Sequence, residues 1–341
     1  MFLQMNFRGR SVPAVGDPNS RIAIVGDYSS AFDEHALCPF SGPPGTVIEQ
    51  CLHMAGLIRG EVYMTNLIKT KPVQRLKDGN EFVTEKPGKV IFSPAGLDAV
   101  SALREELDAT GCNVIVAAGA ASFAALCDLA YISRYRGYVF PSVGLRASRK
   151  VIPIHHPGQA IRGMYTYRHM IICDLRKAKQ ESYQRELVRP DRKLVYSFAN
   201  VEEALQWLEY FEEQAEVSVD IEVLNYEISC IGFSSNPGVA ISLPVSDRWE
   251  LDEELLIWRG IQRVLGNPKS VKVFQNGIFD IHFMLTRNGI VVRGPIHDTM
   301  VGHSIMYPDL PKGLGFLGSL YCGSQEYWKD SVKFTNIKDE S

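Results

Sequence analysis

The chain of 341 residues is long enough for two ordinary domains of about 150 residues each. Its hydrophobic content of 45% and charged content of 22% are typical of a globular protein, and no apolar run reaches the ~18 residues of a membrane span, which predicts no membrane partner. The seven cysteines contain no Cys-x-x-Cys pair and the first residues are too polar for a signal peptide, so reduced thiols and a cytoplasmic location are expected. The net charge of −3 hides an asymmetry between the two halves of the chain. Residues 1–190 are basic, which favours binding to nucleic acid, and residues 191–341 are acidic, which favours binding of cations.

The first half of the chain predicts strands that alternate with helices. Residues 1–20 are rich in Gly, Pro, Ser and Asn, which predicts an irregular arm. Strands are expected at 21–27, 61–69 and 113–119, and helices at about 46–55, 94–110 and 120–129. Residues 70–90 are charged and contain Gly and Pro, so they are expected to form a loop. The alternation is typical of a largely parallel sheet in a three-layer αβα domain.

Basic and aromatic residues interleave between Tyr131 and Lys150. This pattern can bind a DNA backbone and stack bases, and a solvated loop is the alternative interpretation. The basic members are Arg134, Arg136, Arg146, Arg149 and Lys150. A second basic stretch, over residues 183–193, predicts a linker between two domains.

Six short blocks in this half occur in the order found in a known family. They are Gly26, Pro39-Phe40-x-Gly42, Tyr63 to Pro72, Ala118-Gly119-x-Ala121, Arg136-Gly137 and His156-Pro157-Gly158. Together these blocks resemble the family-4 uracil-DNA glycosylases and indicate a domain over residues 21–182. The resemblance implies an enzyme that takes a uracil base out of the DNA stack before it cleaves the bond to deoxyribose.

The resemblance also implies roles for individual residues. Phe40 would stack on uracil, Asn66 would hydrogen-bond its edge, and His156 would stabilise the departing anion. Asp27 corresponds to the acidic residue that positions or activates water. Pro157 belongs to a loop that would enter the duplex. The other residues expected to contact DNA in this domain are Arg136, Arg149 and Lys150.

The sequence departs from the family pattern in ways that bear on activity. The family's Gly-Glu-x-Pro-Gly is Gly26-Asp27-Tyr28-Ser29-Ser30 here, so the Pro-Gly pair is absent and the carboxylate is one methylene shorter. Displacement of a catalytic group by about 1 Å can lower the reaction rate on the order of a hundredfold. Thr70 stands where a cysteine normally follows the lysine, and the N-terminal cysteine pair is missing, which predicts no iron–sulfur cluster. A pocket that binds a base without cutting is therefore the alternative to a glycosylase.

In the second half, polar and apolar residues alternate along residues 218–223, which is the period of a half-buried strand. Asp220 and Glu222 therefore point to the same face. Neighbouring ionised carboxylates repel one another inside a fold, and a divalent cation such as Mg²⁺ turns them into a ligand set. An exposed acidic strand face without a ligand is the alternative interpretation.

A strand, a turn and a helix are predicted over residues 273–285. The turn is at Asn276-Gly277, and Asp280 falls in the first turn of the helix, where a carboxylate is favoured. Asp298 is expected to be the N-cap of a helix over residues 299–306 rather than a metal ligand.

Four blocks of this half resemble the 3′–5′ exonuclease domain of family-A DNA polymerases. They are Asp220-Ile221-Glu222, Gln275 to Asp280, His297 to Met300, and Leu310 to Leu317. The resemblance covers residues 194–341 and implies a ribonuclease-H-like fold that acts on single strands and 3′ ends of DNA. It implies that Asp220, Glu222 and Asp280 bind two Mg²⁺ or Mn²⁺ ions and that Asn276 contacts DNA.

The last motif of that exonuclease family, Tyr-x-x-x-Asp, is not in the sequence, which ends at Ser341, about where the motif would begin. The exonuclease centre is therefore expected to be incomplete in this chain. The order of the two domains resembles the front of a phage-type DNA polymerase, which predicts a role in DNA replication and repair in a host cytoplasm. The polymerase domain would then lie in cis or on a separate chain. The alternative is a non-catalytic module that senses a base or clamps DNA.

Overall fold

The computed structural model describes residues 9–323 except 74, 77, 87, 162–164, 190 and 247. The chain divides into two compact units. The first unit contains Met1–Val188 and Gly315–Ser341, and the second contains Arg189–Leu314. Each unit has its own sheet and its own apolar core. Within the described ranges, no helix is both long and apolar enough to cross a membrane.

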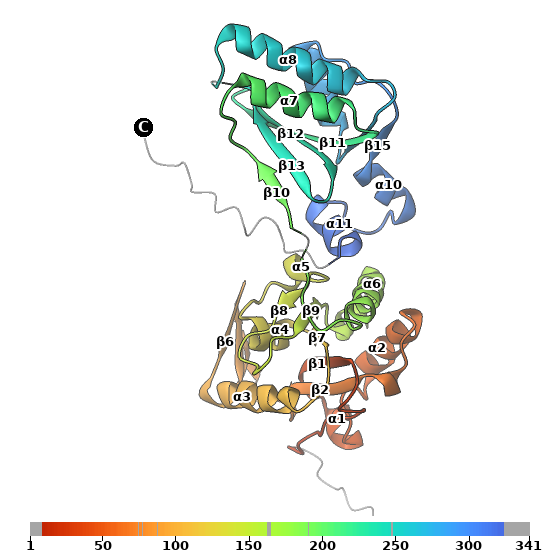
Figure 1. Ribbon diagram of the computed structural model, residues 1–341. Coiled ribbons are helices and arrows are strands. Elements are labelled where there is room, and N and C mark those ends of the chain that lie inside the picture. The colour runs from red at the N-terminus through yellow and green to blue at the C-terminus, as the bar shows by residue number, and fades with distance from the viewer. Residues whose placement is uncertain are drawn as a thin grey trace, which may run out of the picture. The chain divides into compact units, whose positions relative to one another are not determined.

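The first unit is built on a five-stranded sheet with the order β2-β1-β7-β9-β8 (Figure 1). Its strands are β1 (Ile22–Tyr28), β2 (Tyr63–Ile68), β7 (Val114–Ala118), β8 (Phe140–Pro141) and β9 (Lys150–Ile154). β1 pairs in parallel with both β2 and β7, and β7 pairs in parallel with β9, whereas β8 is antiparallel. The carboxyl ends of the parallel strands therefore meet at one edge, where ligands bind in folds of this kind.

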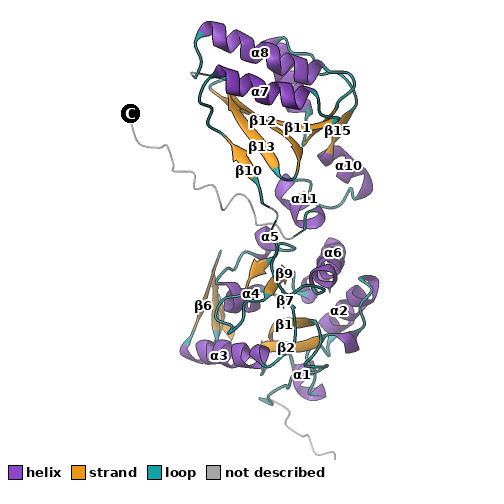
Figure 2. Cartoon of the chain, in the orientation of Figure 1, coloured by secondary structure: helices purple, strands orange, loops and turns teal. Residues whose placement is uncertain are grey.

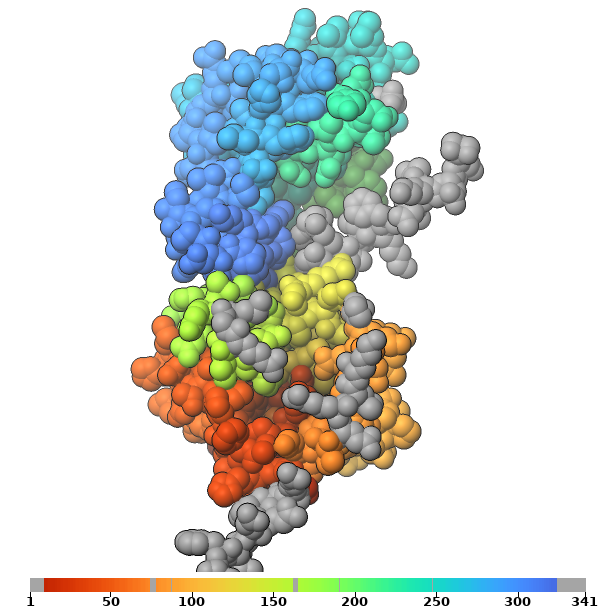
Figure 3. Space-filling view, turned by 180° about the vertical axis from the view of Figure 1, so that it is seen from behind, coloured from red at the N-terminus to blue at the C-terminus, as the bar shows by residue number. Residues whose placement is uncertain are grey.

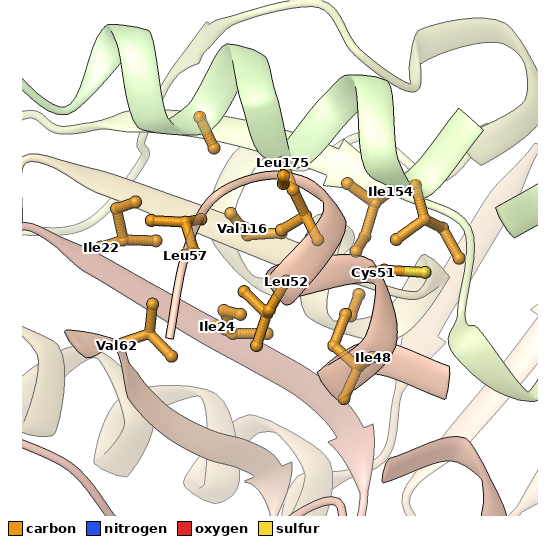
Figure 4. Packing of buried hydrophobic residues seen from close by; sticks show 14 of the residues in the cluster. Ile22, Ile24, Ile48, Cys51, Leu52, Leu57, Val62, Val116, Ile154 and Leu175 are labelled. Carbon is orange, nitrogen blue, oxygen red and sulfur yellow. The ribbon is translucent and has the colours of Figure 1, made fainter. Parts of the chain in front are cut away.

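Helices cover both faces of this sheet. α2 (Pro43–Met54) and α6 (Thr166–Glu181) lie side by side on one face, as Figure 3 also shows, and α3 (Pro94–Asp108) and α4 (Ala120–Cys127) cover the other. Alternate residues of β1 explain the layers, because Ile22 and Ile24 pack with Leu52 and Leu175 (Figure 4) while the residues between them face α3 and α4. The expected three-layer αβα domain is confirmed.

The region expected to be a loop over residues 70–90 is instead a small antiparallel sheet. Its strands are β3 (Arg75–Leu76), β4 (Gly79–Asn80), β5 (Val83–Lys86) and β6 (Lys89–Phe92). Asn80 Oδ1 accepts hydrogen bonds from the N–H groups of Phe82 and Val83, which closes the turn between β4 and β5. The sequence contains a Pro-Gly pair in this region, which is a hairpin signal as well as a loop signal.

Shorter elements connect the main layers of the first unit. They are α1 (Ala31–Ala36), η1 (Arg59–Glu61), α5 (Ile132–Tyr135) and η2 (Pro157–Ile161). The described part of the N-terminal arm is not free of the sheet, because Val12 donates to the Lys69 carbonyl and Val15 exchanges backbone hydrogen bonds with Met64 of β2. Val12 is buried, so the arm covers the outer edge of β2.

The second unit has a six-stranded sheet with the order β10-β13-β12-β11-β14-β15 (Figure 2). Its strands are β10 (Lys193–Val195), β11 (Glu216–Leu224), β12 (Glu227–Asn236), β13 (Val239–Pro244), β14 (Val271–Phe274) and β15 (Ile296–Asp298). β11, β12 and β13 form an antiparallel meander, and β14 and β15 continue from β11 in parallel. This topology is the expected ribonuclease-H-like one.

Two helices, α7 (Val201–Glu212) and α8 (Leu251–Gly266), cover one face of this sheet. They pack closely, since a Cβ added at Gly260 of α8 would lie 2.6 Å from Leu208 Cδ1 of α7. Val219 and Ile221 of β11 point into this core, which leaves the opposite sheet face to the polar residues of the strand. The chain continues through α9 (Ile278–Asn288) and α10 (Thr299–Met306), and α11 (Leu314–Tyr321) follows.

Candidate functional sites

Two of the three base-binding candidates, Phe40 and Asn66, meet at the carboxyl ends of β1 and β2. Gly26 pairs with Asn66 across the two strands, and a Cβ added at Gly26 would overlap Asn66 Oδ1 and lie 2.9 Å from Phe40 Cζ. Phe40 and Asn66 are both buried. The glycine is therefore required by the close approach of an aromatic ring and an amide, which are the two groups that a base pocket needs.

The loop that carries Phe40 is held by residues that the sequence analysis did not single out. Phe40 has a φ of 54°, an uncommon backbone conformation for a bulky side chain. Asp33, which is buried, accepts hydrogen bonds from Ser41 N at 2.7 Å and Ser30 N at 2.7 Å, and Arg59 donates to the Phe40 carbonyl at 3.3 Å. The Ser30-x-x-Asp33 capping box is the sequence signal that could have revealed this support.

Asp27 ends the sequence block at β1 and is buried against the first turn of α4. Its Oδ1 accepts a hydrogen bond from Ser122 N at 2.8 Å. Gly119, the N-cap residue of α4, has no side chain that could accept a hydrogen bond from the first turn of the helix, so Asp27 takes this capping role. Burial raises the pKa of Asp27 to about 6, although backbone N–H groups of the α4 N-terminus favour the ionised form. The carboxylate is thus ionised for the most part at neutral pH and held in one place. The pKa of Glu85 on β5 is raised by desolvation first and then by the charge of Asp27, so these two carboxylates repel one another.

The two histidines after β9 have different surroundings. His156 is half-buried, and its Nδ1 accepts a hydrogen bond from Gly158 N at 3.1 Å, so in the neutral ring the proton is on Nε2. His155 is buried against Tyr167, with ring centroids 4.0 Å apart, and burial lowers its pKa to about 4. Pro157 is buried in η2, so its expected insertion into a duplex is not possible for the conformation in the structure.

Three cations that were expected to contact DNA are buried and bound to groups of the protein. Arg149 donates to the Thr110 carbonyl at 3.0 Å and to Thr110 Oγ1 at 3.0 Å, while Lys150 Nζ pairs with Glu181 Oε2 at 2.8 Å. Arg136 is only 2% exposed. The interpretation of these three residues as DNA contacts is corrected to a structural role, because no phosphate can reach a guanidinium or ammonium group that is enclosed in this way.

Arg136 forms the centre of a buried network in the first unit. Its Nε donates to Asp174 Oδ2 at 2.9 Å and its Nη1 donates to Ser319 Oγ at 2.9 Å. Lys177 donates to the carbonyls of Gly137 and Cys322 at 2.8 Å each. Buried cations thus fix residues 315–322 of the chain to α6 and to the segment before β8.

Replacement of Arg136 by methionine is expected to destabilise the first unit strongly. The change leaves the Asp174 carboxylate buried without its guanidinium, and removal of one partner of such a pair costs roughly 3–5 kcal/mol. Urea unfolding followed by circular dichroism measures the loss. Arg146→Met is the matched control, because the Arg146 side chain is 88% exposed and its loss should cost no more than about 0.5 kcal/mol. Equal midpoints for the two variants would contradict the structural role.

The second unit has a cavity of about 310 Å³ on the sheet face opposite to α7 and α8. Asp220 lines it, together with Gln275, Thr299 and Leu314. Asp220 and Glu222 project from the exposed face of β11, as the alternation of the sequence predicts. The larger cavity of the first unit, about 630 Å³ between α2 and α6, is lined by neither Phe40 nor Asn66.

Asp280 of α9 joins the two strand carboxylates. Its Oδ1 accepts a hydrogen bond from the backbone N–H of Ile221, the residue between Asp220 and Glu222, at 3.1 Å. Asp220 keeps an exposed edge, but the surrounding protein atoms desolvate its carboxylate, and this desolvation first, and then the charges of Asp280 and Glu222, raise its pKa to about 6. The pKa of Asp280 is raised as well, by burial first and with a contribution from Glu222. The three acidic candidates are therefore brought together.

Asp298 is the N-cap of α10, as predicted, and it also fixes the turn before α9. Its carboxylate accepts from Met300 N at 2.8 Å, Gly277 N at 2.8 Å and Asn276 N at 3.2 Å. Burial opposes ionisation, but the backbone N–H groups outweigh it and hold the pKa of Asp298 below its usual range. Asn276 itself is exposed with a φ of 62°, so its side chain stays available for DNA. The contact remains a prediction.

The acidic cluster fits a divalent cation by its chemistry. The donors are carboxylate oxygens, and a cation would relieve their mutual repulsion, which adds to desolvation in raising the pKa of Asp220. Among the described residues, however, no group of three or more His, Cys, Asp and Glu side chains is arranged as a metal site. Metal binding by Asp220, Glu222 and Asp280 stays a prediction. All seven cysteines are free thiols.

The fold and the two sites define a chain with a uracil-glycosylase-like αβα domain and a ribonuclease-H-like domain that has an acidic cleft. Comparison with known proteins identifies the same two kinds of domain. Residues 13–176 match the uracil DNA glycosylase superfamily, and residues 196–336 match a 3′–5′ exonuclease family. The chain belongs to the uracil DNA glycosylase superfamily, and its curated relatives there are type-4 uracil-DNA glycosylases.

The similarity to individual proteins is partial. A type-4 uracil-DNA glycosylase of Archaeoglobus fulgidus is 32% identical over 155 residues, which cover 44% of this chain and 71% of that protein. The type-4 enzyme of Thermotoga maritima is 26% identical over 50% of this chain and 83% of its own length. The catalytic core of RRP6 from Trypanosoma brucei is 18% identical with a TM-score of 0.31, covering 38% of this chain and 35% of that structure.

Proposed function

We propose that the first unit releases uracil from DNA. The observation that supports this proposal is the meeting of Phe40 and Asn66 at Gly26, on the carboxyl edge of a parallel sheet, in a domain that belongs to the uracil DNA glycosylase superfamily. A ring to stack on the base and an amide to read its edge recognise a base that has been turned out of the DNA stack.

The chemistry requires the glycosidic bond to break with its electron pair moving to uracil. The Nε2–H of His156 is a donor for the anion that develops on the base, since Nδ1 is already engaged by Gly158 N. A water molecule then adds to the sugar carbon and loses a proton. Asp27, the last but one residue of β1, is the carboxylate that would orient this water or accept the proton, because it is ionised for the most part at neutral pH.

The second unit supports removal of nucleotides from 3′ ends. Asp220, Glu222 and Asp280 are the residues that would hold a divalent cation, and Asn276 is exposed in the turn before α9, the helix that carries Asp280. When bound, such a cation supplies an activated water and offsets charge on the phosphate. Asp280 is positioned by Ile221 N, and Asp298 fixes the turn that carries Asn276. We further propose that this activity serves a DNA polymerase, in cis or on another chain, in a host cytoplasm.

One observation favours a second candidate function for the first unit, a pocket that senses a base without cutting. The Asp27 carboxylate is bound to the N-terminus of α4 through Ser122 N. A carboxylate that caps a helix has less freedom to approach a water molecule at the sugar carbon. In this alternative, Phe40 and Asn66 still bind the base.

A single oligonucleotide assay separates these functions. A 5′-labelled single strand with one internal uracil is incubated in Mn²⁺, and half of each sample is treated with alkali. A ladder of shortened products identifies the exonuclease, and an alkali-dependent cut at uracil identifies the glycosylase. A bound but intact strand supports the base-sensing alternative.

The pH profile of uracil release is expected to report Asp27. Because burial raises the pKa of Asp27 to about 6, the required carboxylate is protonated below that pH, and activity should fall about tenfold per unit there. Above pH 7 the rate should be level. The measurement is kcat/KM for uracil release between pH 3.5 and 8.5. A midpoint near pH 4, the value of an unperturbed carboxyl group, would contradict the role of this buried group.

A further inference from the structure

Ser29 lies directly behind the proposed base pocket and is fully buried. Its backbone N–H donates to the Ile68 carbonyl at 3.0 Å, and its hydroxyl donates to the same oxygen at 3.4 Å. Asn66 Nδ2 donates to Ser29 Oγ at 3.0 Å. The hydroxyl therefore links the end of β2 to the amide that would read the base.

These bonds determine which end of the Asn66 amide faces the pocket. A serine hydroxyl has one hydrogen, and the Ile68 carbonyl can only accept, so that hydrogen is committed to the carbonyl. Ser29 Oγ can then only accept from Asn66, which requires the NH₂ group and excludes the amide oxygen at that position. The oxygen is turned to the other side, against Gly26 and the Phe40 ring.

The fixed orientation has a consequence for base recognition. In the described part of the chain, no donor is placed on Asn66 Oδ1, which is left as an acceptor beside Phe40. An acceptor there pairs with an imide N–H, as in uracil, and opposes the unprotonated ring nitrogen of cytosine. The second hydrogen of Nδ2 remains for a carbonyl of the base. A freely turning amide would accept either pattern of donors and acceptors.

We propose that Ser29 is a specificity-determining positioning residue, which holds the Asn66 amide so that the pocket selects imide-bearing bases over cytosine. The proposal rests on the proposed base-binding function of the first unit. Ser29 does not touch the base; it acts through Asn66. The position is one at which the glycosylase pattern quoted above has proline, a residue with neither a hydroxyl nor an N–H to make these bonds.

The test compares the dissociation constants of two single-stranded oligonucleotides that differ only in one base, uracil or cytosine, by fluorescence anisotropy in EDTA. The nucleotide that carries this base has a 2′-fluoro sugar in both strands, which resists cleavage of the glycosidic bond, so that the base stays in place during the measurement. Ser29→Ala removes the acceptor, and the preference for uracil is expected to fall at least about tenfold. Ser29→Cys, with a similar volume and a weakly accepting sulfur, should show the same loss, while Ser29→Thr keeps the hydroxyl and should retain the preference. An unchanged preference in a folded Ser29→Ala or Ser29→Cys variant would overturn the proposal.

An N-cap serine away from the base pocket provides a matched control. Ser93 Oγ accepts from Gly96 N at 3.2 Å as the N-cap of α3 and makes no bond to Asn66. Ser93→Ala is expected to lower the melting temperature and to keep the uracil preference. If the wild-type chain has no preference for uracil and releases none, the proposed function itself fails. If it prefers uracil and Ser29→Ala does too, only the role of Ser29 is wrong.

Discussion

Replacement of Asp220 by alanine is expected to reduce the rate of removal of 3′ nucleotides by at least about a hundredfold. Even the loss of a group that only orients a metal ligand lowers metal affinity or activity about 10–100-fold, and the loss of a ligand should have a larger effect. Asp220 lines the cavity of the second unit, and its pKa is raised by desolvation and by the charges of Asp280 and Glu222, so a bound cation would favour its ionised form. The assay follows digestion of a 5′-labelled single strand in Mn²⁺ and in Mg²⁺.

Stability distinguishes this effect from misfolding. The pKa of Asp220 is higher in the folded state than in the unfolded state, so above the pKa of the unfolded state the ionised side chain destabilises the fold. The alanine variant should therefore melt at the same or a higher temperature at pH 8. Glu216→Ala is the matched control, since Glu216 is an exposed acid on the same face of β11 and does not line the cavity. Full activity in the Asp220 variant, or an equal loss in the Glu216 variant, would contradict the assignment.

Replacement of His156 by alanine is expected to lower uracil release by roughly 10²–10³-fold, the cost of removing one donor to a developing anion. The Nε2–H of His156 is that donor, because Gly158 N occupies Nδ1. The melting temperature should change little, since the ring is only half-buried. The measurement is kcat for release of the base from a uracil-containing oligonucleotide.

The adjacent histidine supplies the comparison. His155 is buried, contacts Tyr167 and hydrogen-bonds Gln159 Oε1 at 3.1 Å through Nδ1. Burial keeps its pKa at about 4, so it is neutral at the pH of the assay. His155→Ala should lower the stability, by about 1–3 kcal/mol, while the folded fraction keeps its activity within a few-fold. A larger loss of activity in His155→Ala than in His156→Ala would reverse the two roles.

The sequence pattern predicts those parts of the structure that depend on residues close together in the chain. The alternation around Asp220 predicted its exposed strand face, and the position of Asp298 before an apolar helix predicted its capping role. The strand face of Asp220 and the N-cap role of Asp298 are therefore confirmed, while metal binding stays a prediction. The small sheet over residues 75–92 differs from the expected loop, because charged residues with Gly and Pro are typical of loops and also of short antiparallel hairpins.

Partners far apart in the sequence could not be predicted in the same way. Arg136 lies in a basic, aromatic stretch that is typical of a DNA contact, but its partner Asp174 is 38 residues away on α6. Ser29 lies 37 residues before Asn66, and only the parallel pairing of β1 and β2 brings them together. A cation or a hydroxyl in a sequence shows what it can bind, and the fold decides whether that partner is the protein itself.

The most direct test of the account is to measure free uracil released from a single-stranded oligonucleotide with one internal uracil, by liquid chromatography and mass spectrometry. EDTA is present, so metal-dependent digestion of the strand does not contribute. The account predicts that free uracil accumulates over many turnovers, and that Asn66→Ala and His156→Ala abolish most of the release. A strand that binds tightly but releases no uracil would contradict a glycosylase and identify the first unit as a base-binding module.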